Sequence, residues 1–317
     1  MDTKNHFIMS DQSPILVTGA HRSGTTWVGK MLAASGRYAY VSEPLNRLHR
    51  PGVFRVPVDH WYTYICFDNE TLFLQAFQDT LQLRYHLWDE VKSLRSITDA
   101  GRMFRDWGRF NLGKLWNKQP LLKDPFAVFS AEWFAGRLGC RVVITVRHPA
   151  SFVSSLKRYG WSFNFTDFLS QPLLMRDWLK PFSRDMETVQ NQPHDALVKA
   201  SLLWRMIYHV VWQYGQRELP FHILRHEDLS AEPVEGFMGL YKTLGIPFTP
   251  KVEARIIKAT STENPAEVSK SFIHSVNLDS QANIKIWQKR LTDKEIIRIR
   301  EYTADVADLY YTDQDWA

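Results

Sequence analysis

The sequence predicts an α/β fold with a central parallel sheet of about five strands and helices on both faces of that sheet. Two observations lead to this prediction. Short apolar, β-branched runs recur along the chain, and helix-like segments follow them, which is typical of parallel strands covered on both faces. No repeat, low-complexity segment or flexible linker divides the 317 residues. We therefore expect one domain over residues 14–317, preceded by a disordered or loosely attached segment over residues 1–13.

Five short runs are the expected strands. Each is mainly apolar and close to the length of about four to eight residues that is usual for a buried strand. In chain order they are PILVT (14–18), RYAYVSE (37–43), PLLKD (120–124), RVVITV (141–146) and FHILR (221–225).

Helices are expected between and after these strands. The segment TTWVGKMLAAS follows the first strand, and RHPASFVSSLKR follows the fourth, with Pro149 as its first helical residue. Residues 195–218 and 291–310 also have helical patterns. In the last of these, Thr292 is the expected N-cap and Glu295 its capping-box partner.

Two segments, 44–70 and 159–190, fit the strand–helix alternation poorly. Both are rich in aromatic and polar residues, and in an open α/β sheet such excursions gather at the carboxyl ends of the strands, where ligands bind. We expect them to form walls or lids of an acceptor site, although ordinary connecting structure would have the same composition. The candidate acceptor-binding residues, for which core packing is the alternative, are Trp61, Tyr62, Trp161 and Phe163.

Composition excludes several classes of protein. The net charge of +5, from 39 basic and 34 acidic residues, suits a small anionic ligand, but the absence of any basic block argues against nucleic acid as a partner. Cys66 and Cys140 are the only cysteines, so neither a disulfide scaffold nor a cysteine-based zinc site is expected. No secretory signal or membrane-spanning apolar run is present, and we expect a cytoplasmic protein without a membrane anchor.

The segment TGAHRSGTTW, residues 18–27, has the order strand, glycine-bounded turn, helix start. Gly19 and Gly24 have the spacing of a nucleoside-triphosphate-binding loop, but Thr25 stands where that loop has its lysine, and a basic residue occurs inside the loop as Arg22. Backbone N–H groups and the helix dipole at such a turn bind phosphate without a special side chain. We therefore expect a P-loop-like domain whose anion site differs from that of magnesium–nucleotide enzymes.

A second candidate anion site lies in VRHPASFVSSLKR. Arg147 stands at the end of the fourth expected strand, and Ser155 follows eight residues later on the next helix. A guanidinium offers a forked pair of donors to a phosphate, and a serine hydroxyl adds one more. The pair alone is a weak indication, but it becomes informative together with the glycine loop.

With these two motifs the chain resembles the PAPS-dependent sulfotransferases, which use 3′-phosphoadenosine 5′-phosphosulfate (PAPS). The family's 5′-phosphosulfate loop has the form [KR]-[ST]-G-T-T followed by Trp or Leu, and its 3′-phosphate motif has the same arginine-to-serine spacing. The resemblance implies that Arg22 bridges the 5′-phosphate and the sulfuryl group, and that Trp27 stacks on adenine unless it is a core residue. The loop residues implied to hold the donor are Arg22, Ser23, Gly24, Thr25, Thr26 and Trp27.

The resemblance extends towards the C-terminus. ILRHEDL (223–229) is similar to the family's R-Y-E-D-L segment, with His226 in place of the tyrosine that can contact adenine. NIKIWQKRL resembles the basic loop that closes over the 3′-phosphate, which makes Lys285, Lys289 and Arg290 candidates; solvated surface charge is the alternative for each. The implied co-substrate is PAPS, the product is 3′,5′-adenosine bisphosphate (PAP), and no metal is required.

Catalytic candidates follow from the same comparison. The segment LLKDPF contains Lys123, and tyrosylprotein-type sulfotransferases have a similar segment whose lysine touches the transferring group; pairing with Asp124 is the alternative. Glu43 follows Arg22 by 21 residues, and the resemblance places the catalytic glutamate of those enzymes in a similar position after the loop. A desolvated carboxylate has a raised pKa, which suits a general base. His21 and His60 remain further candidates for that role.

Three functions are therefore compared. The first is transfer of the sulfuryl group of PAPS to an acceptor hydroxyl, with a carbohydrate or natural product favoured. The second is a P-loop kinase that uses ATP and magnesium, which leaves Thr25, Arg147 and Ser155 unexplained. The third is a non-catalytic nucleotide-binding protein, which leaves the catalytic candidates unexplained. The sequence does not indicate an oligomeric state.

Overall fold

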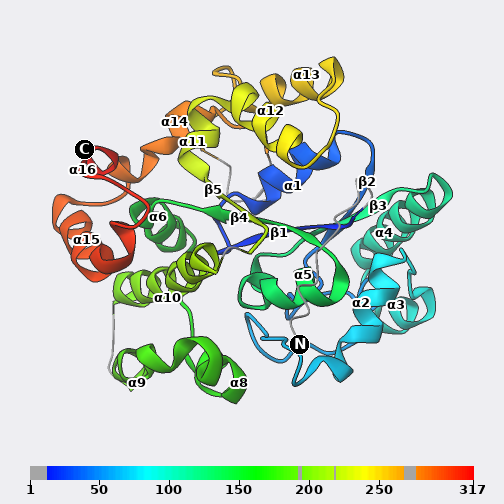
Figure 1. Ribbon diagram of the computed structural model, residues 1–317, viewed down its shortest axis with the longest axis horizontal. Coiled ribbons are helices and arrows are strands. Elements are labelled where there is room, and N and C mark those ends of the chain that lie inside the picture. The colour runs from blue at the N-terminus through cyan, green and yellow to red at the C-terminus, as the bar shows by residue number, and fades with distance from the viewer. Residues whose placement is uncertain (1–12, 192–194, 218, 268–275) are drawn as a thin grey trace, which may run out of the picture.

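The computed structural model describes residues 13–191, 195–217, 219–267 and 276–317, so most of the expected N-terminal segment lies outside the described residues. Its centre is one five-stranded, all-parallel sheet of order β2-β3-β1-β4-β5 (Figure 1). The predicted α/β fold is confirmed, and each predicted strand is present within two residues of its expected ends. The strands are β1 Ile15–Gly19, β2 Tyr38–Ser42, β3 Gln119–Lys123, β4 Arg141–Val146 and β5 Phe221–Arg225.

The strand register brings the carboxyl ends of the strands to one edge. Gly19, the last residue of β1, lies beside Thr145 of β4, and Val17 lies beside Lys123 of β3. Lys123 in turn lies beside Ser42, the last residue of β2. The loops that leave these strands therefore start next to one another, although they are far apart in the sequence.

Successive residues of the central strand face two separate hydrophobic cores. Ile15 and Val17 face the first core, which helices α1, α12 and α13 cover together with the short helix α11, whereas Leu16 faces the second. Continuous apolar runs are needed in such strands because neither face meets water. The helices on and beside the first core are α1 Thr25–Ala33, α11 His226–Ala231, α12 Pro233–Thr243, α13 Pro250–Thr260 and α14 Ser280–Ile284.

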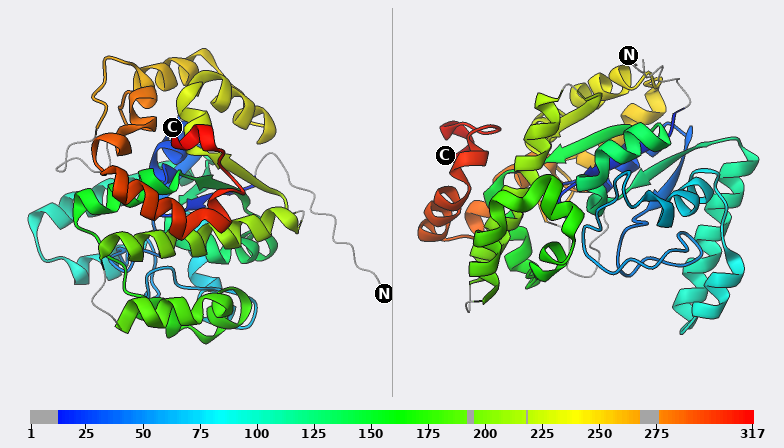
Figure 2. Two further views of the ribbon diagram at one scale, coloured as in Figure 1. Left: turned by 90° about the vertical axis from the view of Figure 1, so that its left-hand side faces the viewer. Right: turned by 60° about the horizontal axis from the view of Figure 1, so that its bottom comes forward.

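The second core is the larger of the two and lies against the remaining long helices. Figure 2 shows the C-terminal helix α15 lying along α10 at one side of the sheet. The helices of this side are α2 Leu74–Leu81, α3 Leu87–Ser93, α4 Ile97–Leu115, η2 Pro125–Ser130, α5 Ala131–Leu138, α6 Pro149–Tyr159, α10 Ala196–Gln216, η5 Ile286–Lys289, α15 Asp293–Ala307 and α16 Asp313–Trp316. Over the described residues, none of the helices combines the length and the apolar character that crossing a bilayer requires.

The predicted starts of α6 and α15 are confirmed. Pro149 is the first residue of α6, where its missing N–H costs nothing. Thr292 caps α15, and Glu295 bonds back to the N-cap backbone in a complete capping box. Asp195 caps α10 by accepting a hydrogen bond from the backbone N–H of Leu197 at 2.9 Å.

The two segments that broke the strand–helix alternation are hydrogen-bonded to each other. Residues 43–69 form turns without a long helix or strand. The N–H of Trp61 donates to Asp167 at 3.2 Å, and the N–H of Tyr64 donates to Gln171 at 2.8 Å. The short elements here are η1 Glu70–Leu72, α7 Thr166–Leu169, α8 Pro172–Leu174, η3 Met175–Leu179, η4 Lys180–Phe182 and α9 Ser183–Asn191.

Candidate active site

The loop between β1 and α1 is tight because two glycines allow close approach. Gly19 and Gly24 have φ of 143° and 94°, a region that side-chain-bearing residues rarely adopt. A Cβ at Gly24 would lie 2.4 Å from the His226 ring, and one at Gly19 would lie 2.5 Å from the carbonyl oxygen of Thr145. The first turn of α1 follows directly, and its N–H groups have no intrahelical partners, which makes this end an anion site.

Ser23 fastens this loop to the sheet. Its buried hydroxyl donates to the carbonyl of Ala20 at 2.5 Å and lies 2.7 Å from the Thr145 hydroxyl. The backbone N–H of Ser23 also donates to Ala20, at 3.1 Å. The structure therefore directs the Ser23 side chain into the protein and not into the cavity beside the loop.

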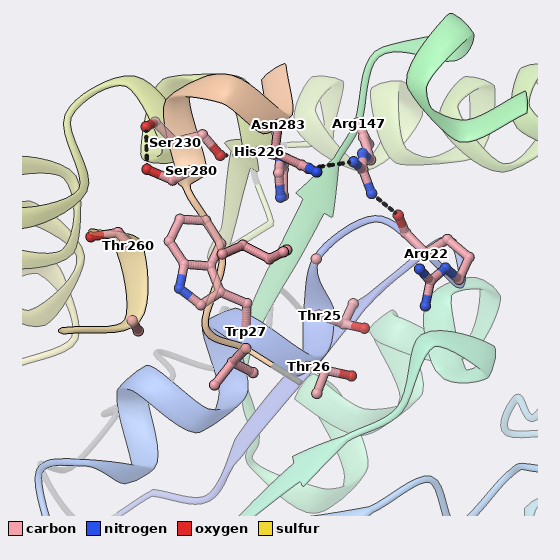
Figure 3. Close-up of a pocket in the computed structure, with 14 residues that line it drawn as sticks. Arg22, Thr25, Thr26, Trp27, Arg147, His226, Ser230, Thr260, Ser280 and Asn283 are labelled. Carbon is pink, nitrogen blue, oxygen red and sulfur yellow. Dashed lines mark hydrogen bonds between the residues drawn. The ribbon is translucent and has the colours of Figure 1, made fainter. Parts of the chain in front are cut away.

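A cavity of about 110 Å³, here called the small cavity, lies over the start of α1 (Figure 3). Its walls come from the loop, the ends of β4 and α13, helix α11 and the segment before α14. The residues that line it are Arg22, Gly24, Thr25, Thr26, Trp27, Arg147, His226, Ser230, Ala259, Thr260, Val276, Leu278, Ser280 and Asn283.

Arg147 supplies a buried cation to the small cavity. Its guanidinium donates to the carbonyl of Arg22 at 2.7 Å and to the side chain of Asn283 at 3.0 Å, as Figure 3 shows. Its Nε is buried without a hydrogen-bond partner among the described residues. Burial lowers the pKa of Arg147 to about 10, while the charge of Glu227 opposes that shift, so the group is a cation at neutral pH. A buried cation with an unsatisfied donor fits an anionic ligand.

Trp27 both lines the small cavity and packs against the first core. Its ring lies 5.5 Å from the His226 ring and 5.1 Å from that of Phe237, edge to face in both cases. The indole N–H of Trp27 is buried without a hydrogen-bond partner in the described part of the chain. Burial lowers the pKa of His226 well below its usual value, so a neutral imidazole stands where the family has tyrosine.

Four other residues predicted to bind the nucleotide do not line the small cavity. The hydroxyl of Ser155 accepts a hydrogen bond from Arg22 Nε at 3.1 Å. Lys285 donates to the carbonyl of Ala317 at 2.6 Å, Arg290 pairs with Glu267 at 3.0 Å, and Lys289 is exposed. Within the C-terminal segment the uncharged Ser280 and Asn283 line the cavity instead, and sequence reasoning missed both because it searched for basic residues.

A second cavity of about 660 Å³, here called the large cavity, lies on the other side of the loop. All four aromatic residues predicted to contact an acceptor line it, together with Glu43. Arg22, Thr25 and Thr26 line both cavities. The residues that line the large cavity are His21, Arg22, Thr25, Thr26, Glu43, Asn46, Leu48, Trp61, Tyr62, Pro125, Phe126, Leu156, Gly160, Trp161, Ser162 and Phe163.

Glu43 and Lys123 form an ion pair at the edge of the large cavity. Lys123 Nζ donates to one carboxylate oxygen of Glu43, and the Asn46 side chain donates to the other at 2.6 Å. Lys123 is only 1% exposed and lies behind Glu43, outside the large cavity. Glu43 itself has a φ of 51°, and non-glycine residues in this strained region cluster at functional sites.

Asp124 holds the turn that carries Glu43. Its buried carboxylate accepts hydrogen bonds from the N–H groups of Leu45 at 2.6 Å and Phe126 at 3.0 Å. Burial raises the pKa of Asp124 to about 7, and the charge of Glu43 adds to the shift. Lys123 thus pairs with Glu43, and Asp124 positions the turn beside it. Sequence reasoning missed the positioning roles of Asp124 and Asn46, because neither belongs to a spacing pattern.

The two histidines considered as bases differ in position. The Tyr62 hydroxyl lies 2.6 Å from Nδ1 of His21 and accepts the backbone N–H of His21 at 3.2 Å. Burial, with the charge of Arg22, lowers the pKa of His21 to about 4, which leaves a neutral hydrogen-bond donor. His60 lies 3.6 Å from Asp167 and does not line the large cavity.

The fold and the site together define an α/β protein whose glycine-bounded loop lines two cavities. The family model of the sulfotransferase family matches residues 14–250 of the chain. The protein therefore belongs to the sulfotransferase family, as the motifs predicted.

Individual relatives and solved structures are also similar to the chain. Human carbohydrate sulfotransferase 5 is 25% identical over 205 residues, which are 63% of this chain and 43% of the relative; the chain thus spans less than half of that protein. Among solved structures, the sulfotransferase domain from the curacin biosynthetic pathway is 16% identical, with 95% of this chain and 98% of the other covered and a TM-score of 0.44. Mouse sulfotransferase SULT7A1 complexed with PAP is 11% identical, with 96% and 87% covered and a TM-score of 0.46.

Proposed function

We propose that the protein transfers the sulfuryl group of PAPS to a hydroxyl of a carbohydrate acceptor. One observation carries the proposal: Arg22, Thr25 and Thr26 line both the small and the large cavity. A donor in the small cavity and an acceptor in the large one would meet at these three residues. Such an arrangement holds the two reactants in position for direct transfer.

The small cavity suits the nucleotide of PAPS. The N–H groups at the start of α1, with the hydroxyls of Thr25 and Thr26, would hold the 5′-phosphosulfate. The partly unsatisfied guanidinium of Arg147 would hold the 3′-phosphate, and the Trp27 ring would pack on the adenine. The donor carries roughly four negative charges at neutral pH, and Arg22 and Arg147 offset part of them. We therefore expect transfer to proceed without a metal ion.

The reaction is an in-line displacement at sulfur. The acceptor oxygen forms a bond to the sulfur, the bond between sulfur and the 5′-phosphate oxygen breaks, and its electron pair leaves with PAP. The acceptor proton passes to a base, which balances the step. Because charge builds on the leaving phosphate as in phosphoryl transfer, Arg22 and the N–H groups of α1 would stabilise the transition state.

Glu43 is the proposed base. Its carboxylate lines the large cavity, and Lys123 and Asn46 fix its orientation. Lys123 would act through Glu43 in this arrangement, since it is buried behind the carboxylate. His21 lines the same cavity beside Tyr62, and its lowered pKa leaves the ring neutral, so we assign it a positioning role.

A carbohydrate acceptor fits the walls of the large cavity. Trp61 and Trp161 contribute indole rings, whereas Tyr62 is fully buried and Phe163 is 8% exposed, so both belong mainly to the core behind the wall. Aromatic rings pack well against the apolar faces of sugars. The human relative named above is a carbohydrate sulfotransferase. We propose that segments 44–70 and 159–190 form the acceptor side of one sulfotransferase domain over residues 14–317.

Thermal unfolding without magnesium tests the donor assignment. The protein is compared alone and with PAP, AMP or ATP. A ligand at a hundred times its Kd adds about 2.7 kcal/mol of stability, which raises the melting temperature by a few degrees. We expect PAP to stabilise the protein more than AMP or ATP. Stabilisation by ATP only after magnesium is added, with no effect of PAP, would overturn the proposal.

A further inference from the structure

A basic groove of about 1210 Å³ lies at the β2 edge of the sheet and shares Thr26 with both cavities. Helices α4 and α13 form its two sides, as their places on either side of β2 in Figure 1 suggest, and residues of α1 and β2 form its floor. Nine of its lining residues are lysine or arginine. Among the residues that the structure describes, no aspartate or glutamate lines it.

The basic residues of the groove form two stripes at helical spacing. Arg102, Arg105 and Arg109 follow one another on α4, and Lys251, Arg255 and Lys258 do so on α13. Side chains three or four residues apart share one face of a helix, so each stripe lines its own side of the groove. Each stripe extends over about 10 Å along its helix, which is longer than a single phosphate or sulfate group.

Acidic neighbours neutralise the basic stripe of α13 less than that of α4. On α4, Asp106 pairs with Arg105 at 2.9 Å and with Arg109 at 3.7 Å, and Arg102 lies 3.7 Å from Asp99. The positive charges also converge on the floor of the groove. Burial lowers the pKa of Lys30, and the charges of Arg109, Lys123 and Arg255 lower it further. Cations from α4, β3 and α13 therefore repel one another here, and an anionic ligand would relieve that repulsion.

The groove meets the proposed transfer point. Thr26 lines the groove as well as both cavities. Lys123 also lines the groove, and its partner Glu43 lines the large cavity. A chain bound along the groove would consequently reach the residues that are placed between donor and acceptor.

We propose that this groove binds the acidic groups of the acceptor, which is therefore an acidic polysaccharide. This inference rests on the proposed function and narrows its substrate class. The length of the stripes requires a chain with several anionic groups, and the link to Thr26 requires that chain to carry acceptor hydroxyls. Nucleic acid would meet the first requirement, but it is not the carbohydrate acceptor that the large cavity favours.

Binding of a labelled heparin octasaccharide tests the inference. A groove variant, Lys251→Ala with Arg255→Ala and Lys258→Ala, is compared with a control variant that loses the same charge elsewhere, Arg184→Ala with Lys242→Ala and Lys294→Ala. The three control positions are exposed and do not line the groove. We expect the groove variant to bind about tenfold more weakly at low salt, with a shallower salt dependence, and the control to bind within about twofold of the parent. PAP binding is measured on all three proteins.

Each outcome decides a different point. Equal weakening of heparin binding in both variants would show that the groove is not the polysaccharide site. The donor assignment is unaffected in that case if PAP still binds. Tighter binding of a single-stranded DNA of matched charge, lost in the groove variant alone, assigns the groove to nucleic acid and overturns the acidic glycan. Failure of PAP to bind the parent protein overturns the proposed function, and the acceptor role of the groove with it. Failure of a neutral maltooctaose to compete with heparin is required by the inference.

Discussion

The small and large cavities share three residues but are built in different ways. In the small cavity, six of the fourteen lining residues belong to the loop and helix start after β1 or follow the end of β4, which the parallel register places side by side; the other eight come from α11, α13, α14 and the segment before α14. The large cavity owes most of its wall to the two excursions, which are held by contacts such as the bond from Trp61 to Asp167. The sheet thus positions the loop residues that both cavities share, whereas contacts between segments distant in the sequence shape the rest of both walls.

The largest effect should come from the acceptor side. Glu43→Gln removes the proposed base and should lower kcat by about a thousandfold, within the range of general-base contributions, while the Kd for PAP changes little. Steady-state kinetics with PAPS, together with PAP titration, measure both. An unchanged kcat would show that Glu43 is not the base and that the base does not lie in the large cavity.

Glu301→Gln, at an exposed position of α15, is the matched control for loss of one carboxylate. Since Lys123 is buried and loses its charged partner in the Glu43 variant, the melting temperature of both variants is also recorded. A large drop in melting temperature for Glu43→Gln with unchanged PAP binding would identify a structural contribution beside the chemical one.

Buried Asp124, at the turn that carries Glu43, should make the stability of the protein depend on pH. Asp124 has a pKa of about 7 in the folded protein and near 3.8 when unfolded, so the folded state binds more protons between about pH 4 and 7 and loses stability as the pH rises through that window. Asp124→Asn removes this pH-dependent change in the free energy of unfolding, which amounts to at most ~4 kcal/mol. Urea unfolding of both proteins from pH 4 to pH 8 measures the difference.

Other buried groups act in the opposite direction over the same range. Burial lowers the pKa of His21 to about 4 and that of His148 to about 3, so each adds stability as the pH rises towards its unfolded value of 6.5. Both histidines are present in parent and variant and cancel in the difference. A difference that is constant with pH would show that Asp124 is already ionised at pH 4.

On the donor side, Arg147→Ala should weaken PAP binding about 10- to 100-fold, because a charge-assisted hydrogen bond to the 3′-phosphate is lost. AMP, which lacks that phosphate, should bind nearly as before and thereby serves as the control for folding. Calorimetric titration of both nucleotides measures the ratio. Equal losses for PAP and AMP would place Arg147 away from the 3′-phosphate.

A smaller effect is expected at the wall of the large cavity. Trp161 is 39% exposed and lines that cavity, so Trp161→Ala should raise the KM for a carbohydrate acceptor about tenfold, as expected for loss of one aromatic contact. The Kd for PAP should not change. Trp88→Ala, at a tryptophan that is 76% exposed and lines neither cavity, is the control. An increase in the PAP Kd instead would mean that the two cavities are not divided as described.

The smallest effect is expected for Ser155→Ala. Its hydroxyl contacts Arg22 and does not line the small cavity, so PAP binding should fall only about threefold. Titration with PAP measures this. A loss as large as that of Arg147→Ala, confined to nucleotides with a 3′-phosphate, would restore the direct contact that the motif implies.

The sequence predicted the sheet well for a physical reason. Strands such as Arg141–Val146 are buried on both faces, and only continuous apolar runs fit there. The loop residues Gly24, Thr25 and Thr26 were also predicted, because a single short segment contains both the turn and the helix start. All three line the small cavity, and their binding of the donor stays a prediction.

Side-chain direction was not predictable in the same way. Ser23 and Ser155 belong to motifs, yet Thr145 and Arg22 draw their hydroxyls away from the small cavity. Asn46 positions the Glu43 carboxylate within one turn, and the geometry of that turn follows from the positive φ of Glu43 itself. No periodic pattern in the sequence encodes such a turn.

Thr26 borders the small cavity, the large cavity and the basic groove. If two ligands meet at one residue, each changes the free energy at which the other binds, and linkage requires the two changes to be equal. If PAP changes the Kd for the acceptor by a given factor, the acceptor must change the Kd for PAP by the same factor. If the proposed function holds, Thr26 would link the occupancies of the donor, acceptor and polyanion sites in one coupled equilibrium.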